Sequence, residues 1–215
     1  MEVKDFCLPV RSEEEVLAEQ DQLMRAAVYE LLGTLLAAPP SAEVLGNLQQ
    51  IEELEETDGE AAASEIAMGW RLLRQASMKA SPVELEDEYF SLFVGLGRGE
   101  LVPFGSWYMT GFLMEKPLAI LRRDLQSLGI EREQGVTETE DHIAALCTAM
   151  GLIIRNSREI GYEREKQFFD DHLEPWAKTF FTDLQHANSA HFYRAVGFFG
   201  ESIFKFEKEY FAMQA

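Results

Sequence analysis

The sequence predicts an all-α fold, a single-domain helical bundle that spans residues 1–215. Three observations predict it. Apolar residues recur at helical spacing along nearly the whole chain, and no strand-like alternation of useful length appears. Hydrophobic residues make up 47% of the chain, which is ample for a buried core. A length of 215 residues also suits one helical unit with a single core, so we expect one domain that folds alone.

Start and stop signals divide the first 93 residues into four predicted helices. Ser12 and Glu15 have the capping-box spacing, and the helix that they open ends at Pro39-Pro40. Ser41 begins a second, acidic helix that runs to about Glu56. The third and fourth helices are marked by apolar stripes, which are Ile66, Trp70 and Leu73, and then, after the cap Ser81-Pro82, Leu85, Tyr89, Leu92 and Phe93.

The segment 95–105 holds four glycines and Pro103, and it is the one extended loop in the sequence, with the composition of a hinge. A short helix over 106–114 follows, and then a helix from Pro117 to Gly129. Thr137 is the predicted cap of the next helix. Apolar stripes mark the last three predicted helices: Ile143, Leu146, Cys147, Met150 and Ile154; Phe169, Leu173, Trp176, Phe180 and Leu184; and Phe192, Val196, Phe199, Ile203, Phe206 and Tyr210.

Charge and cysteine usage narrow the class of partner and the compartment. The formal net charge of −19 repels nucleic acid phosphates and anionic lipids, and it favours a cationic partner, although it is equally explained as a charge that keeps the protein soluble. Cys7 and Cys147 lack the spacing of a metal site or a redox pair, which is typical of a reduced compartment. The first residues do not have the order of a secretory signal, and no apolar run approaches the roughly 18 residues of a membrane span. We therefore expect a cytoplasmic protein.

A search for catalytic chemistry finds one group of residues to test, Glu138, Asp141, His142 and His172. The Glu-x-x-His pairs of di-iron bundles and the His-Glu-x-x-His of zinc proteases are both absent. A carboxylate at the start of a helix is also explained by the backbone dipole and the exposed amides there. A metal-dependent helical enzyme that uses these four residues therefore stays as an alternative, and we expect no metal and no cofactor.

A series of motifs in the middle of the chain resembles the TorD/DmsD family of molybdoenzyme maturation chaperones. Between about Glu84 and Trp176 the motifs occur in the order of that family, and five short motifs in order are more specific than any one alone. They are Tyr89-Phe90-Ser91-Leu92-Phe93; Pro103-x-x-Ser106-x-Tyr108; Met114 with Pro117; Glu138-x-x-Asp141-His142; and Phe168-x-x-x-His172-Leu173-x-x-Trp176. Thr139 departs from the pattern, because proline is usual there, and its backbone is less rigid.

The resemblance implies a cytoplasmic, non-enzymatic chaperone with a TorD-like helical fold. It would bind the twin-arginine signal peptide and the body of a molybdenum-cofactor oxidoreductase and assist its maturation before export. The resemblance does not identify the client enzyme. It also leaves open whether the protein is a monomer or a domain-swapped dimer, and whether it binds guanine nucleotide or molybdenum cofactor. A scaffold that binds only the mature partner is a further alternative.

A twin-arginine peptide has a basic start and an apolar middle, so its receptor needs carboxylates beside an apolar groove. We expect Trp107, Tyr108, Leu92 and Phe93 to supply apolar wall, and acidic residues such as Glu84, Asp87 and Glu88 to face the arginines. The full set of predicted peptide-binding residues is Tyr89, Leu92, Phe93, Pro103, Ser106, Trp107, Tyr108, Glu138, Asp141, His142, His172 and Trp176.

Overall fold

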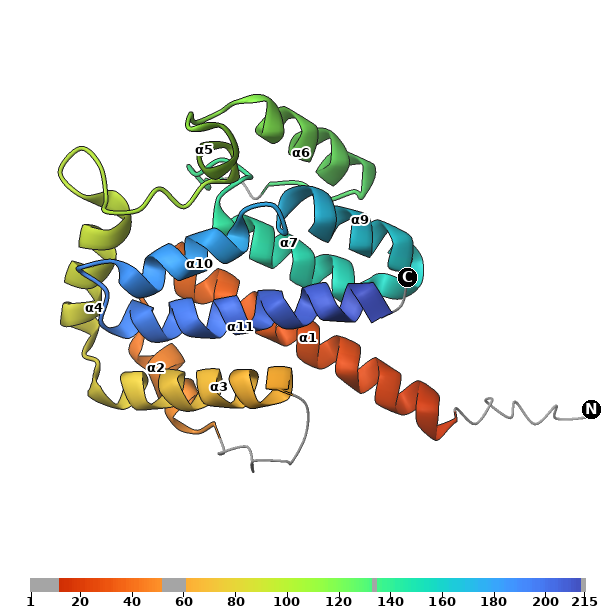
Figure 1. The fold of residues 1–215 in the computed structure, drawn as a ribbon, viewed down its shortest axis with the longest axis horizontal. Coiled ribbons are helices and arrows are strands. Elements are labelled where there is room, and N and C mark those ends of the chain that lie inside the picture. Colours follow the sequence, from red (N-terminus) through yellow and green to blue (C-terminus); the bar gives the residue numbers. More distant parts are fainter. Residues whose placement is uncertain (1–11, 52–60, 133–134, 214–215) are drawn as a thin grey trace, which may run out of the picture.

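The computed structural model describes residues 12–51, 61–132 and 135–213, and the predicted all-α fold is confirmed (Figure 1). Within these ranges no helix is both long and apolar enough to cross a membrane. The helices are α1 (Glu13–Ala37), α2 (Ala42–Gln49), α3 (Ala61–Lys79), α4 (Pro82–Tyr89), the π-helical turn η1 (Phe90–Val94), α5 (Gly105–Thr110), α6 (Lys116–Ser127), α7 (Ile143–Arg155), α8 (Ser157–Ile160), α9 (Tyr162–His172), α10 (Ala177–His186) and α11 (Phe192–Met213).

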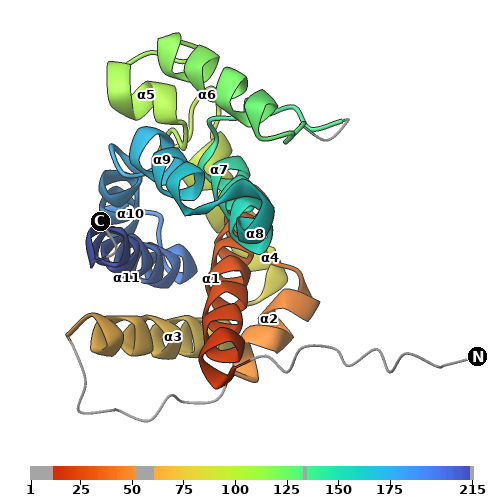
Figure 2. The ribbon, with the colours of Figure 1, turned by 90° about the vertical axis from the view of Figure 1, so that its right-hand side faces the viewer.

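The core forms where α1 packs along α7 and where α11 packs against both α10 and α3 (Figure 1). Figure 2 shows α5 and α6 at one end of the molecule and α2 and α3 at the other. The close approach of α10 and α11 depends on Gly200, because a Cβ atom there would lie 2.3 Å from the ring of Phe181. Large apolar side chains fill the interior, among them Tyr29, Leu32, Leu35, Phe169, Phe180, Phe181, Tyr193 and Phe199.

Several predicted boundaries are confirmed. The hydroxyls of Ser41 and Ser81 accept the N–H groups of Val44 and Glu84, as N-caps of α2 and α4. Helix α6 ends at Ser127, two residues before the predicted end, and Gly129 has the expected left-handed conformation with a φ of 71°.

Other boundaries correct the predictions. Helix α2 ends at Gln49 before the expected Glu56, which lies outside the described residues. Helix α5 ends at Thr110 because Gly111 adopts a left-handed conformation with a φ of 81°. Helix α7 starts at Ile143, since His142 is its cap and the hydroxyl of Thr137 binds the carboxylate of Glu138 instead.

The stripe from Phe169 to Leu184 was predicted as one helix, and that prediction is wrong. The chain breaks between α9 and α10, where Pro175 has no N–H and disfavours a helical conformation of the residue before it. The indole of Trp176 turns into the break and donates a hydrogen bond to the carbonyl oxygen of His172 at 2.8 Å. The side chain thereby satisfies a carbonyl at the end of α9.

Candidate functional site

The end of the glycine-rich loop is fastened to the segment that precedes α7. The N–H of Gly105 donates to the carbonyl of Asp141 at 2.8 Å, and the N–H of Ile143 donates to the carbonyl of Pro103 at 2.9 Å. Phe104 and His142 form an isolated antiparallel bridge between the same two segments. These bonds fix the position of α5 relative to the start of α7.

Asp141 strengthens this junction with its side chain. One carboxylate oxygen accepts the N–H of Ser106 at 2.9 Å, and the other accepts the hydroxyl of Thr139 at 2.5 Å. Only 3% of Asp141 is exposed. Since Ser106 lies in the first turn of α5, the negative charge lies against N–H groups that have no acceptor within that helix. Asp141 therefore holds backbone in place and presents almost no surface to a ligand.

His142 is the N-cap of α7 and is also buried. Its Nδ1 atom accepts the N–H of Ala144 at 3.1 Å, which places the ring proton of the neutral form on Nε2. Burial lowers the pKa of His142 to about 4, although the negative charges of Glu138 and Asp141 oppose that shift. The imidazole is therefore uncharged at neutral pH.

A groove with a volume of about 420 Å³ lies beside this histidine, between α6, the connection that follows α6, and α7. We call it the α6–α7 groove. Its lining is mostly apolar and comes from Ala37, Leu125, Ile130, Val136, Ala144, Ala145, Thr148, Ala149 and Leu152, together with Glu131, Arg132, Glu138, Glu140 and His142. An apolar surface with several carboxylates along it is the arrangement that a basic and apolar peptide requires.

The carboxylates of the groove differ in their surroundings. A hydrogen bond from its own backbone N–H and another from the hydroxyl of Thr137 lower the pKa of Glu138, although burial opposes them. Glu138 is exposed and stays ionised at neutral pH. Glu140 is mostly covered, and its carboxylate pairs with the guanidinium of Arg122 on α6.

Of the twelve predicted site residues, Glu138 and His142 line the groove. Tyr89 lies next to it, because its hydroxyl donates to the carbonyl of Ala37 at 3.0 Å. Burial raises the pKa of Tyr89, and the charge of Glu138 contributes to the rise. These three residues therefore come together around one end of the groove.

Most of the remaining predicted residues lie in the interior, and Phe93 adjoins the first three residues because its ring packs on that of Tyr89, with 5.0 Å between the ring centroids. Phe93 packs edge to face on Tyr193, and Tyr108 packs against Trp176 while its hydroxyl donates to Asp183 at 3.0 Å. The half-buried ring of Trp107 lies under the guanidinium of Arg98, 4.6 Å from it. Leu92, Pro103, Ser106 and Trp176 are buried, so they support the surface and do not themselves form it.

His172 lies apart from the other three residues of the enzyme alternative. Its Nε2 atom is 3.1 Å from a carboxylate oxygen of Asp124 on α6, and its ring packs on Phe168. Across the described ranges, no group of three or more histidine, cysteine, aspartate or glutamate side chains is placed to hold a metal ion.

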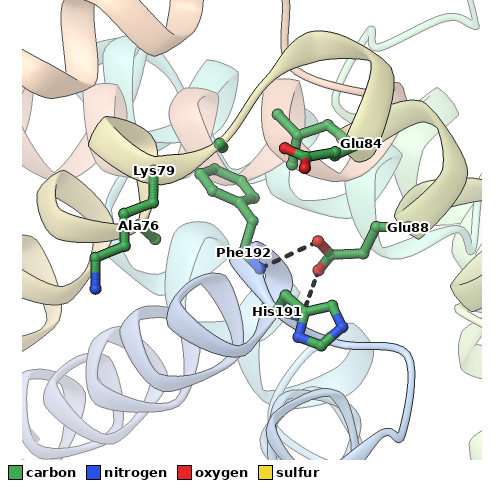
Figure 3. A pocket seen from close by; sticks show the side chains of 8 residues that line it. Ala76, Lys79, Glu84, Glu88, His191 and Phe192 are labelled. Atoms are coloured by element: carbon green, nitrogen blue, oxygen red, sulfur yellow. Dashed lines mark hydrogen bonds between the residues drawn. The ribbon is translucent and has the colours of Figure 1, made fainter.

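A second pocket, of about 340 Å³, lies between α3, α4 and the start of α11 (Figure 3). Glu88 lines this pocket, and the sequence analysis predicted that it faces the arginines of a bound peptide. Its carboxylate instead accepts the N–H groups of His191, Phe192 and Tyr193 at 2.7, 3.1 and 2.8 Å. Glu88 is 8% exposed and serves as the cap of α11.

Sequence reasoning missed most of the groove lining, above all Leu125, Ala145, Leu152 and Glu140. One signal was present in the sequence. Helix α7 carries Ala144, Ala145, Ala149 and Leu152 in addition to its buried stripe, so it is apolar on more than one face. A helix of that kind is covered on both faces or borders a binding surface.

Comparison with known proteins adds a family to this geometry. Residues 59–182 match the model of the nitrate reductase delta subunit family. Two of the similar curated proteins are named chaperone protein TorD. The one from Vibrio vulnificus (strain YJ016) is 25% identical over 195 residues, covering 83% of this chain and 87% of the relative. The one from Shewanella loihica is 24% identical over 187 residues, covering 80% and 85%.

A solved structure has the same fold. It is that of a proposed redox enzyme maturation protein from Archaeoglobus fulgidus, with a TM-score of 0.51 and 18% identity, covering 96% of this chain and 99% of that chain.

The helical fold and the family match define the class of protein, a chaperone for redox enzymes that is not itself an enzyme. The chain belongs to the nitrate reductase delta subunit family, of the TorD type.

Proposed function

We propose that this chaperone acts in the cytoplasm, where it binds the twin-arginine signal peptide of a molybdenum-cofactor oxidoreductase and assists the maturation of that enzyme before export. The observation that carries the proposal is the α6–α7 groove, where an apolar lining lies beside Glu131, Glu138 and Glu140. The apolar middle of the peptide would lie in the groove, and its arginines would face the carboxylates.

The electrostatics of the groove suit a cationic ligand. Glu138 is held ionised, and His142 is held neutral by burial, so no positive charge from that imidazole opposes an arginine at neutral pH. The net charge of −19 adds a long-range field that attracts a basic segment. Charge of this kind acts mainly on encounter rate and selectivity.

Apolar burial would supply most of the affinity. Burying about 400 Å² of apolar peptide surface is worth roughly 10 kcal/mol before costs. Association and ordering cost an estimated 4 to 15 kcal/mol, and each exposed ion pair returns about 0 to 1 kcal/mol. Only modest affinity is left, about micromolar at the favourable end of these ranges, and it depends more on the apolar lining than on any single carboxylate.

Calorimetry with a synthetic peptide tests the proposal directly. A peptide with paired arginines and an apolar core should bind the wild-type protein with a Kd in the micromolar range. Leu152→Ser removes apolar lining at a residue that is 42% exposed, so it should weaken binding about fivefold or more without unfolding the chain.

Leu17→Ser is the matched control. Leu17 is 59% exposed and lies 20 residues before Ala37 on α1, which is about 30 Å along the helix. This variant should bind like the wild type. Absence of heat and of competition at high peptide concentration would refute the proposal. Retention of the partner enzyme after deletion of its leader would favour the scaffold alternative instead.

The proposal also includes predicted residues outside the groove lining. Trp107 and Tyr108 stay predicted contacts, for the body of the partner or for the peptide beyond the groove. The loop 95–105 stays a predicted hinge for exchange between two copies. Its closure is held by Glu100, whose carboxylate accepts the N–H groups of Asn188 and Ser189 at 2.5 and 3.0 Å. If this loop opened as a hinge so that two copies exchanged helices, these bonds would have to break.

A further inference from the structure

One carboxylate of the α6–α7 groove is already paired within the chain. The Nε and Nη2 atoms of Arg122 both lie 2.8 Å from the same oxygen of Glu140. The Glu140 side chain is 17% exposed and that of Arg122 is 51% exposed. Glu140 lines the groove, whereas Arg122 stands on α6 outside the lining. Arg122 therefore neutralises the charge of Glu140 from outside the groove lining.

The other two carboxylates of the groove are open. Within the described part of the chain, neither Glu131 nor Glu138 has an ion pair. Arg132 also lines the groove, but its guanidinium donates to the backbone carbonyl of Glu138 at 3.3 Å and not to a carboxylate. The groove thus presents two carboxylates without an ion pair and one that is occupied.

We propose that Arg122 is a specificity-determining residue of the groove, which limits the number of ligand cations that gain a carboxylate partner to two. The proposal rests on the proposed function, because it concerns the same peptide site. A third cation on the ligand would have to displace Arg122 from Glu140 or share that carboxylate with it. Displacement exchanges one guanidinium pair for another, and sharing places two like charges together, so neither returns much free energy.

The test compares two peptides and four proteins. The peptides share one apolar core and carry either two or three neighbouring arginines. The proteins are the wild type, Arg122→Gln, Arg123→Gln and the double variant Arg122→Gln with Glu140→Gln. Arg123 is the matched control, because it is 72% exposed, it lies one residue away, and it pairs with Asp124, which does not line the groove. Both single variants therefore change the net charge equally.

The third arginine should tighten binding to Arg122→Gln by about two- to fivefold more than it tightens binding to the wild type, which is the range of an exposed ion pair. Arg123→Gln should show the wild-type increment. The additional gain should disappear in the double variant, because it acts through Glu140. Circular dichroism should show that all four proteins are folded, since every altered side chain lies at the surface or at the groove.

Two results would overturn the inference alone. One is an equal increment from the third arginine in wild type and Arg122→Gln, and the other is a gain that persists in the double variant. Failure of both peptides to bind any of the four proteins would remove the proposed function together with this inference. Binding without the difference between variants would leave the proposed function in place.

Discussion

The carboxylate of Asp141 accepts the backbone N–H of Ser106 at 2.9 Å, and this contact ties the start of α5 to the segment before α7. The two residues are 35 positions apart in the sequence and both are buried. This contact gives the aspartate of the Asp141-His142 motif a structural role. It does not require Asp141 to touch a bound peptide.

Asp141→Ala should lower the free energy of unfolding by about 1–3 kcal/mol, because the N–H of Ser106 loses its acceptor in a buried site. Asp141→Asn keeps an acceptor oxygen and should lose less. Urea denaturation measures both, and hydrogen exchange should rise in residues 103–110. If both variants kept wild-type stability and lost only peptide affinity, Asp141 would be a direct ligand of the peptide and not a positioning residue.

The protein should lose stability in acid through His142. Burial lowers its folded pKa to about 4, whereas an unfolded histidine titrates near 6.5. Between these values the unfolded state binds more protons, so the stabilising contribution is complete above pH 6.5 and is lost as the pH falls toward 4. The loss is at most about 3 kcal/mol for a difference of that size.

His142→Asn keeps an N-cap for α7 and removes the titration, so its stability should depend less on pH between 4 and 6.5. Thermal melts across that range measure the effect. Burial also lowers the pKa of His172, so part of the pH dependence should remain in the variant. His186→Asn makes the same substitution at an exposed residue and leaves the cap of α7 in place, so it serves as the comparison. An unchanged slope in His142→Asn would contradict the assignment.

The fold was predictable because most of the longer helices carry an apolar stripe, and the caps Ser41 and Ser81 are local signals. The short helix α8 buries no residue and gave no such signal. The break between α9 and α10 was missed because the stripe from Phe169 to Leu184 keeps helical spacing across Pro175. The proline was the better guide, since it acts on the backbone directly, whereas spacing only describes side chains.

The groove was predictable in kind but not in place. The acidic composition and the family resemblance together predict carboxylates beside an apolar surface. Their location depends on the end of α1, on α6 and on α7, which meet only in the folded chain. Periodicity within one helix does not reveal which neighbour leaves part of a face uncovered. Glu88 and Asp141 show the same limit, because a conspicuous carboxylate caps a distant helix in both cases.

Glu165→Gln should leave stability unchanged or raise it at neutral pH. Arg25 donates two hydrogen bonds to Glu207, at 2.7 and 2.6 Å, and it lies 2.9 Å from Glu165 without the geometry of a hydrogen bond. Burial raises the pKa of Glu165, although the charge of Arg25 opposes the shift. Folding therefore disfavours the ionised form of Glu165. The resulting loss of stability is complete above the folded pKa and disappears as the pH falls to the unfolded pKa.

Arg25→Met is the contrasting variant, because it leaves two buried carboxylates without a cation and should cost about 3–5 kcal/mol. Denaturant titrations at pH 7 separate the two outcomes. A loss of several kcal/mol in Glu165→Gln would show that its charge stabilises Arg25 more than burial penalises it.

Glu88→Ala should be strongly destabilising, because three backbone N–H groups at the start of α11 share its carboxylate. Figure 3 shows two of these bonds, from His191 and Phe192. Removing the carboxylate leaves buried donors without an acceptor, at a cost of about 1–3 kcal/mol for such a group and more where several are affected. Glu88→Gln keeps one acceptor oxygen and should lose about half as much. Denaturant titration measures both, with Glu86→Ala on the exposed side of α4 as the control. If Glu88→Ala matched that control, the carboxylate would be free to face a ligand in the pocket, and Glu88 would not be the cap of α11.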